Sequence, residues 1–198
     1  MYGCSLKARF REERRPRSLS QLIRLYIAKW RDRAKKELES FRRECFHSAV
    51  ERAALAVHDD EDGRRKRFSH QRRLNRRVLD EARERLLSTS AKLRRAKGFS
   101  DLHESIKDAL AGITGLGSLY YYDTALRIGA NLQKMPERVY LHRGTRRGAR
   151  AMGLDWRADS LDPKCLPKEL SALDPHEIED FLCIFKDRLG HAGAAIRI

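Results

Sequence analysis

The sequence predicts an all-α protein, because apolar residues recur at intervals of three and four positions along most of its 198 residues. No segment shows the alternation of apolar and polar residues that is typical of a half-exposed strand, and we find no internal repeat. The length fits a single domain, and an apolar content of 41% is enough to form a hydrophobic core beside 36% charged residues.

The chain divides into three parts in this interpretation. They are a basic arm (1–17), a basic helical region (18–99) and a second helical region (100–198), the last two packed as one globular unit. Helices are expected over 18–57 (kinked, or split in two), 69–96, 100–111, from 118 onward, over 137–152 and over 175–188. The first helix follows from the apolar stripe between Leu22 and Val57, and the acidic stretch 58–63 predicts a loop after it.

Helix boundaries follow from capping residues. Gly98 ends the second helix, and Ser100 is expected to be the N-cap of the third. The last long helix has the clearest start, because Asp174 at the N-cap, Pro175 at the first position and Glu177 at the third form a capping box.

The positive charge lies in the N-terminal half of the chain. Residues 1–100 hold 29 Lys and Arg against 14 Asp and Glu, whereas residues 101–198 hold 14 of each, so the net charge of +15 belongs to the first half. The segment 64–77 contains eight of these basic residues with little local acidity. Such a surface attracts polyanions, and we expect a nucleic-acid partner. The alternative is a solvated, Arg-rich helical surface.

Several classes of protein are excluded by composition. No apolar run approaches the length of a membrane span, and the N-terminus lacks the apolar core of a signal peptide, so we expect a cytoplasmic protein without a membrane partner. Cys4, Cys45, Cys165 and Cys183 are scattered, which indicates buried, reduced thiols and neither disulfides nor an iron–sulfur site. No metal-ligand or cofactor motif is present, and we expect no metal, no cofactor and a monomer.

A glycine-rich turn between two predicted helices is the most informative motif. Two glycines flank one apolar residue, which suits a backbone that must approach a ligand closely. Backbone N–H groups at the start of the following helix form a natural phosphate site. The DNA-binding residues expected here are Thr114, Gly115, Leu116, Gly117 and Ser118.

The stretch Ile113-Thr114-Gly115-Leu116-Gly117 resembles the helix-hairpin-helix element of DNA-binding proteins, whose pattern is an apolar residue, any residue, then Gly-apolar-Gly. The layout of residues 100–190 is similar to the helix-hairpin-helix superfamily of DNA glycosylases. This resemblance implies an all-α helical bundle that contains a helix-hairpin-helix unit and acts on double-stranded DNA.

The chain departs from that family at two positions. In the family the hairpin is followed by a linker and a helix with the catalytic Asp, and the matching stretch 136–143 has Tyr140 or its neighbours there, none of them acidic. Where bifunctional members carry a lyase Lys, this chain has Ser118-Leu119. The resemblance therefore implies a monofunctional glycosylase, which hydrolyses the N-glycosidic bond without a Schiff base.

Asp123 is the first candidate for catalysis. A carboxylate beside the glycine-rich turn could position water or stabilise a cationic sugar as an extruded base leaves. The structural alternative is a partner for the helix dipole or an ion pair with Arg127 one turn later. His142 and Tyr140 are the other catalytic candidates, two residues apart and able to line the same pocket.

Two further groups of residues complete the predicted site. Tyr120, Tyr121 and Tyr122 are the candidates for a base pocket, although successive residues on a helix point about 100° apart, so at least one faces the core. Arg143, Arg146, Arg147 and Arg150 share one helical face and are expected to grip phosphates, since their helix offers no acidic partners.

The sequence thus predicts a monofunctional DNA glycosylase for a damaged or modified base, in repair or in defence against phage. The alternative is a non-catalytic helix-hairpin-helix module that binds nucleic acid, such as an accessory subunit. A metal-dependent nuclease using the acidic run 59–62 is the third possibility, and a solvated loop is the preferred interpretation of that run.

Overall fold

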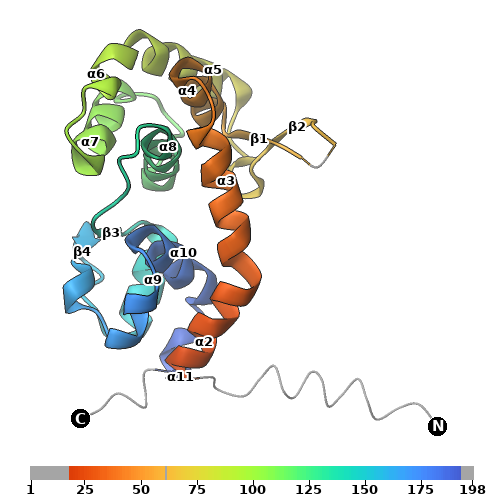
Figure 1. Ribbon diagram of the computed structural model, residues 1–198. Coiled ribbons are helices and arrows are strands. Elements are labelled where there is room, and N and C mark those ends of the chain that lie inside the picture. The colour runs from red at the N-terminus through yellow and green to blue at the C-terminus, as the bar shows by residue number, and fades with distance from the viewer. Residues whose placement is uncertain (1–17, 61, 193–198) are drawn as a thin grey trace.

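The computed structural model describes residues 18–60 and 62–192 and is mainly helical, as expected for an all-α protein. The expected basic arm and Cys4 lie outside the described residues. Figure 1 shows two lobes, one above the other, joined along one side by a long helix. Within the described residues, no helix is long and apolar enough to cross a membrane.

The upper lobe is built from the middle of the chain. Its elements are α3 (Asp32–Arg42), α4 (Phe46–Leu55), β1 (Val57–Asp59), β2 (Arg65–Arg67), η2 (Ser69–Gln71), α5 (Arg76–Ser88), α6 (Ser90–Arg94), α7 (Phe99–Ala109) and α8 (Ser118–Asn131). Their apolar residues form one core, centred on side chains such as Phe41, Leu86 and Leu102, which are completely buried.

The lower lobe combines both ends of the described chain. Its elements are α2 (Leu19–Tyr26), β3 (Val139–Tyr140), α9 (Arg143–Ala151), β4 (Ser160–Leu161), η3 (Pro163–Cys165), η4 (Lys168–Ala172), α10 (Pro175–Phe185) and α11 (Leu189–Ala192). A second core unites Leu22 and Tyr26 of α2 with Phe181 and Phe185 of α10. Core packing therefore groups α2 with the C-terminal elements, across the division expected between residues 99 and 100.

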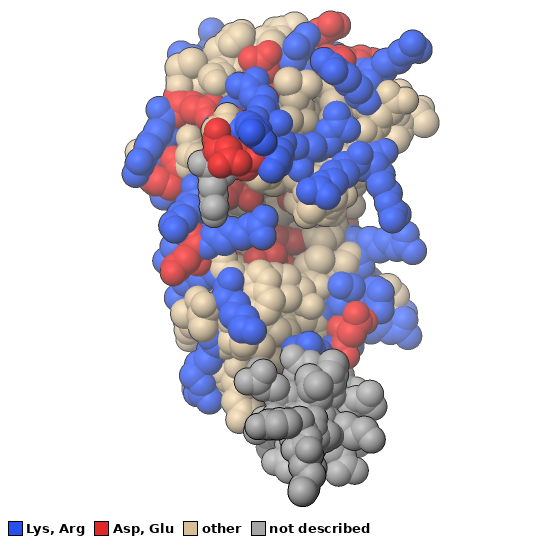
Figure 2. All heavy atoms as spheres, turned by 90° about the vertical axis from the view of Figure 1, so that its right-hand side faces the viewer, with Lys and Arg blue, Asp and Glu red and all other residues tan. Residues whose placement is uncertain are grey.

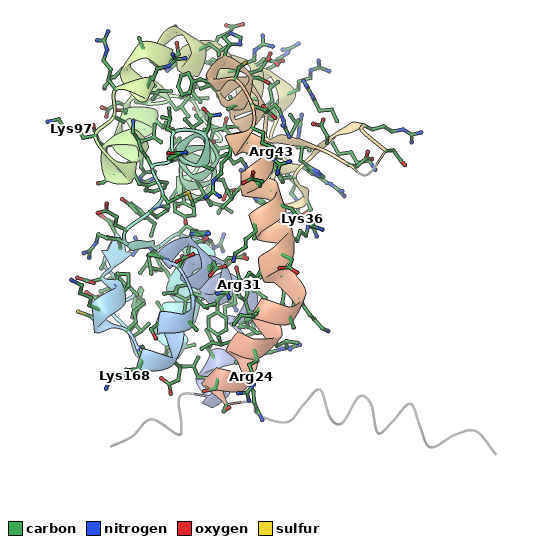
Figure 3. The ribbon with its side chains drawn as sticks, in the orientation of Figure 1. Arg24, Arg31, Lys36, Arg43, Lys97 and Lys168 are labelled. Carbon is green, nitrogen blue, oxygen red and sulfur yellow. The ribbon has the colours of Figure 1, made fainter. Side chains whose placement is uncertain are left out.

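The long helix begins at Ser18, whose side chain forms a capping box with Gln21. It passes through a π-helical segment, η1 (Ile27–Arg31), into α3 and ends at Arg43, so the expected interruption before α4 is present. Figure 3 labels Arg24, Arg31, Lys36 and Arg43 along this helix. Arg31 lies beside the lower lobe (Figure 3) and binds Glu177 of α10 with two hydrogen bonds of 2.7 and 2.8 Å.

The expectation that the chain has no strands was wrong, because two short antiparallel pairs occur. β1 and β2 form a hairpin that projects from the upper lobe (Figure 1), where a loop was expected over 58–63. Ala56 ends α4 in the left-handed conformation with φ 54°, and Gly63 adopts φ 72° at the tip of the hairpin. Alternation is too short in three-residue strands to give a clear signal.

The helix expected over 137–152 was also wrong in its first part. Val139 and Tyr140 form β3 and pair with Leu161 and Ser160 of β4, because alternate residues of this stretch face the lower core. The helix α9 starts only after His142.

Two other boundaries differ from the prediction. The helix expected over 69–96 is replaced by η2, α5 and α6, because Asn75 caps α5 by accepting from the N–H of Arg77. The N-cap of α7 is Gly98 rather than Ser100. In contrast, the capping box of Asp174 and Glu177 at the start of α10 is present as predicted.

The cysteines are less buried than expected. Cys45 and Cys165 are exposed, because they lie at the break before α4 and at the end of η3, and of the three cysteines that the structure describes only Cys183 is partly buried.

We predict that a single methyl group at Gly148 destabilises the lower lobe. An added β-carbon there would lie 2.2 Å from the carbonyl oxygen of Leu182, a backbone atom that moves only if α10 moves. Gly148→Ala is expected to lower the free energy of unfolding by about 1–3 kcal/mol, measured by urea denaturation.

The matched control is Gly190→Ala in α11, where an added β-carbon has no described heavy atom within 4 Å. This substitution is expected to leave stability unchanged or to raise it by up to about 1 kcal/mol, since alanine restricts the unfolded chain. Equal stabilities of the two variants would contradict the close contact between α9 and α10.

Candidate functional site

Asp123 lies in the second turn of α8, on the side that faces η2. Its Oδ2 atom is 2.7 Å from Nε2 of His70 and accepts a hydrogen bond of 2.9 Å from the amide of Gln71. The ion pair with Arg127, which the sequence offered as the structural alternative, is present but longer, at 3.9 Å. The Oδ1 atom accepts no hydrogen bond from the described residues, and the side chain keeps 13% of its surface exposed. One oxygen is therefore anchored and the other is free.

Arg127 holds this arrangement from inside the upper lobe. Its side chain is 3% exposed, and its guanidinium lies 3.7 Å above the ring of Phe68. It donates to Glu37 of α3 and to the side-chain oxygen of Gln71, each over 3.1 Å. Because Gln71 also donates to Asp123, the buried guanidinium and the carboxylate share one network of hydrogen bonds.

An aromatic cluster joins the two lobes beside Asp123. The ring of Tyr122 lies 5.8 Å from Tyr140 and 6.5 Å from His142, and Tyr140 also makes edge contacts with Phe99 and His103 of α7. The structure thus brings together three residues that the sequence placed in one site. The hydroxyl of Tyr122 is buried and has no hydrogen-bond partner among the described residues.

His142 is the N-cap of α9 and is 4% exposed. Its Nδ1 atom accepts from the N–H of Gly144 over 3.2 Å, so the ring proton belongs on Nε2, which donates to Glu179 of α10. Glu179 is itself buried, and the loss of hydration raises the pKa of its carboxyl from 4.5 to about 7, against the opposing effect of His142.

Asp180 adds a further carboxylate from α10. It accepts a hydrogen bond of 3.1 Å from the hydroxyl of Tyr26, and burial raises its pKa to about 6. The negative charge of Asp123 acts in the same direction on both Asp180 and Glu179. Carboxylates from the two lobes therefore lie close enough to repel one another.

Glu179 and Asp180 were absent from the predicted site. The apolar pattern of α10 indicated only which of its apolar residues face the core. It carried no information about Glu179 and Asp180, the acidic residues between Ile178 and Phe181. His70 and Gln71 were missed for a different reason: they lie more than fifty positions from Asp123 in the sequence, and no local pattern connects them.

Charge is distributed unevenly around this site. Figure 2 shows acidic side chains recessed between the lobes, with Lys and Arg side chains spread over the surface around them. The exposed basic residues of the hairpin, of the segment before α5 and of the start of α5 are Arg64, Arg65, Lys66, Arg72, Arg73, Arg76 and Arg77. A polyanion would meet the basic rim before the acidic centre.

The glycine turn (residues 112–117) joins α7 to α8. Gly112 and Gly115 adopt φ 81° and 99°, a region that favours glycine. Gly117 is the N-cap of α8 and offers no side chain to the first N–H groups of that helix. Thr114, Gly115, Gly117 and Ser118 are exposed and Leu116 is partly buried.

The three consecutive tyrosines separate as expected on a helix. Tyr120 and Tyr122 are buried in the upper core, and the hydroxyl of Tyr120 donates to the carbonyl of Ala54. Tyr121 is the one of the three that keeps partial exposure, and its hydroxyl lies 3.5 Å from the carbonyl oxygen of Leu116 in the glycine turn.

Two of the four arginines of α9, Arg146 and Arg147, have acidic partners, and these come from segments outside the helix. Arg146 donates to the carbonyls of Trp156 and Arg157 and to Asp159, so it braces the turn after α9. Arg147 pairs with Asp187 over 2.6 Å.

Arg143 and Arg150 are exposed, and neither forms an ion pair within the described residues. Arg150 lies 5.3 Å above the ring of Trp156.

One group of side chains has the spacing of a metal site. The ligand atoms of Asp174, His176 and Glu177 lie within 4.8 Å of one another. However, Glu177 accepts from Arg31 and from the N–H of Asp174, so this group is already accounted for by helix capping and an ion pair.

Comparison of the chain with protein-family models, with curated proteins and with solved structures finds no match in any of the three.

We predict that Glu179 makes the stability of the protein depend on pH. Because the pKa of its carboxyl is 4.5 in the unfolded chain and about 7 in the folded one, the unfolded state ionises first as pH rises between these values. The free energy of unfolding therefore falls across this window. Glu179→Gln, which still accepts from His142, is expected to remove a fall on the order of 3 kcal/mol.

The measurement is urea denaturation of both proteins at several values of pH across the window. Asp187→Asn serves as the control, since Asp187 is exposed and its loss should leave the slope unchanged. An identical slope in Glu179→Gln and the unchanged protein would contradict the buried, protonated state of Glu179.

Proposed function

We propose that the protein is a monofunctional DNA glycosylase whose glycine turn is a helix-hairpin-helix unit, and that Asp123 assists the departure of the base. The observation that carries this proposal is the arrangement of Asp123. Its Oδ2 atom is fixed by His70 and Gln71, its Oδ1 atom is free, and it lies in the helix that the glycine turn begins.

A carboxylate fixed in this way suits the hydrolysis of an N-glycosidic bond. The sugar gains positive charge as the base leaves, and a fixed, partly desolvated carboxylate stabilises that charge without reorganising. Because Asp123 remains partly exposed, a sugar can approach it from solvent. His142 and Tyr140 belong to the aromatic cluster beside Asp123. Because His142 is buried, its role is to position its neighbours.

Two surfaces are assigned to DNA recognition: the N-terminal end of α8, with its helix dipole, and the basic face of α9. The uncapped N–H groups at the start of α8 bind one phosphate through the exposed glycine turn, and Arg143 and Arg150 of α9 bind others. Tyr121 is the aromatic residue of the three that is available for stacking near the turn.

The second candidate is a non-catalytic module that binds nucleic acid. It is favoured by Tyr140, which takes the place of the family's catalytic Asp, and by the burial of Tyr120 and Tyr122, which leaves a single tyrosine for stacking. The glycosylase is preferred because a module that only binds phosphates has no need of a carboxylate held in a basic surface.

We predict that Asp123→Asn releases base at least about 100 times more slowly than the unchanged protein, since a neutral amide cannot stabilise the developing charge. The assay exposes duplex DNA with unmodified, damaged or hypermodified bases to the protein and then to hot alkali, which cleaves at abasic sites. Binding of the DNA is expected to stay within about twofold, because the phosphate contacts are elsewhere.

The control is Asp108→Asn, an exposed carboxylate on α7. Breaks that appear without alkali and vanish with EDTA would indicate a nuclease instead. If the DNA is bound but not altered for any base tested, the non-catalytic binding module becomes the preferred function over the glycosylase.

We predict that Arg143→Ala combined with Arg150→Ala weakens the dependence of binding on salt. If each arginine neutralises one phosphate, the slope of log K against log salt concentration should fall by about 0.9 for each. Lys168→Ala is the control, an exposed charge on η4 at the far end of the lower lobe (Figure 3). Equal slopes in the double variant and the control would remove α9 from the DNA surface.

A further inference from the structure

His70 lies on the solvent side of Asp123, in the short turn η2. Its Nε2 atom is 2.7 Å from Oδ2 of Asp123, and its side chain keeps 44% of its surface exposed. The residues around it in the sequence include the exposed arginines 64–65 and 72–73. An accessible imidazole, paired with the candidate carboxylate, thus stands within the most basic segment of the chain.

The neighbours of His70 fix its position. Gln71 is 3% exposed and binds both Asp123 and Arg127, while Phe68 is buried beneath the guanidinium of Arg127. The turn is therefore anchored on both sides of His70. The ring of His70 lies 6.2 Å from that of Phe68, and its side chain remains largely outside the core.

We infer that His70 is a second catalytic residue of the proposed hydrolysis, the general base that takes a proton from the attacking water. This inference rests on the proposed function and assigns the water-activating role, which Asp123 does not fill by itself. It also gives the basic segment 64–77 a role, because a DNA strand bound along those arginines would pass beside the imidazole.

The hydrogen bond to Asp123 sets the tautomer that this role requires. With the ring proton on Nε2 and donated to Oδ2, the Nδ1 atom carries a free lone pair, and it has no hydrogen-bond partner among the described residues. The water oxygen bonds to the anomeric carbon, and its proton passes to Nδ1. The glycosidic bond breaks, its electron pair leaves with the base, and the base takes a proton from solvent.

Charged groups from two elements stabilise the imidazolium formed in this step. Asp123 of α8 contacts the ring directly, and Asp180 of α10 lies near enough for the charge of His70 to lower the pKa of Asp180. Within the same site, His142 cannot fill this role, since it is buried and both of its ring nitrogens are engaged.

The test compares His70→Gln with His47→Gln, an exposed histidine on α4 outside the site. Glutamine keeps a donor for Asp123 but cannot accept a proton. We expect His70→Gln to lower kcat for base release at least about 100-fold with KM for DNA within about twofold, and His47→Gln to change neither. In His70→Gly, added imidazole should restore part of the lost rate, which it would not do for a structural role.

A second readout does not depend on turnover. Nitrogen-15 NMR of the unchanged protein should show the ring proton of His70 on Nε2, and Asp123→Asn should alter that signal while leaving His47 unchanged. A proton on Nδ1 of His70, or base release that persists in His70→Gln, would overturn the role of His70 alone. Absence of base release by the unchanged protein would overturn the proposed function and, with it, this role.

Discussion

The buried guanidinium of Arg127 is the constraint on which the candidate site depends. A charge removed from water is costly unless hydrogen bonds and opposite charges replace its hydration. Those partners are Glu37 of α3, Gln71 of η2 and, at longer range, Asp123 of α8, with the ring of Phe68 beneath. Because these partners come from three elements, the hydrogen bonds of this one guanidinium fix α3, η2 and α8 relative to each other.

This constraint explains why Asp123 and His70 meet at the surface in a defined geometry. The anchored residues Phe68 and Gln71 leave His70 outside the core and against the carboxylate. The lower lobe adds Glu179 and Asp180, whose raised pKa values reflect burial and the nearness of like charge. Carboxylates that are costly to ionise, placed together under a basic surface, contribute little to stability and are typical of functional sites.

Local patterns predicted much of the helical framework. Asp174 was expected to begin a helix through a capping box and does so, since capping depends on residues three positions apart. The helix expected from residue 18, on its apolar pattern, is also present and begins with a capping box at Ser18. The stretch 137–142 was wrongly assigned to a helix because pairing with β4, which lies some twenty residues later, decides its conformation. The hairpin of β1 and β2 was missed for a different reason, because strands of only three residues show too little alternation to be recognised.

The sequence by itself determined the helical class of the protein and its basic N-terminal half. Only the tertiary structure decided what the candidate site residues contact. For Asp123 the sequence offered a catalytic role or an ion pair with Arg127 one turn away, yet its close partners are His70 and Gln71, and His142 binds Glu179 of α10. Such pairs form because elements far apart in the sequence pack together within each lobe, and helical spacing carries no information about residues so distant in the chain.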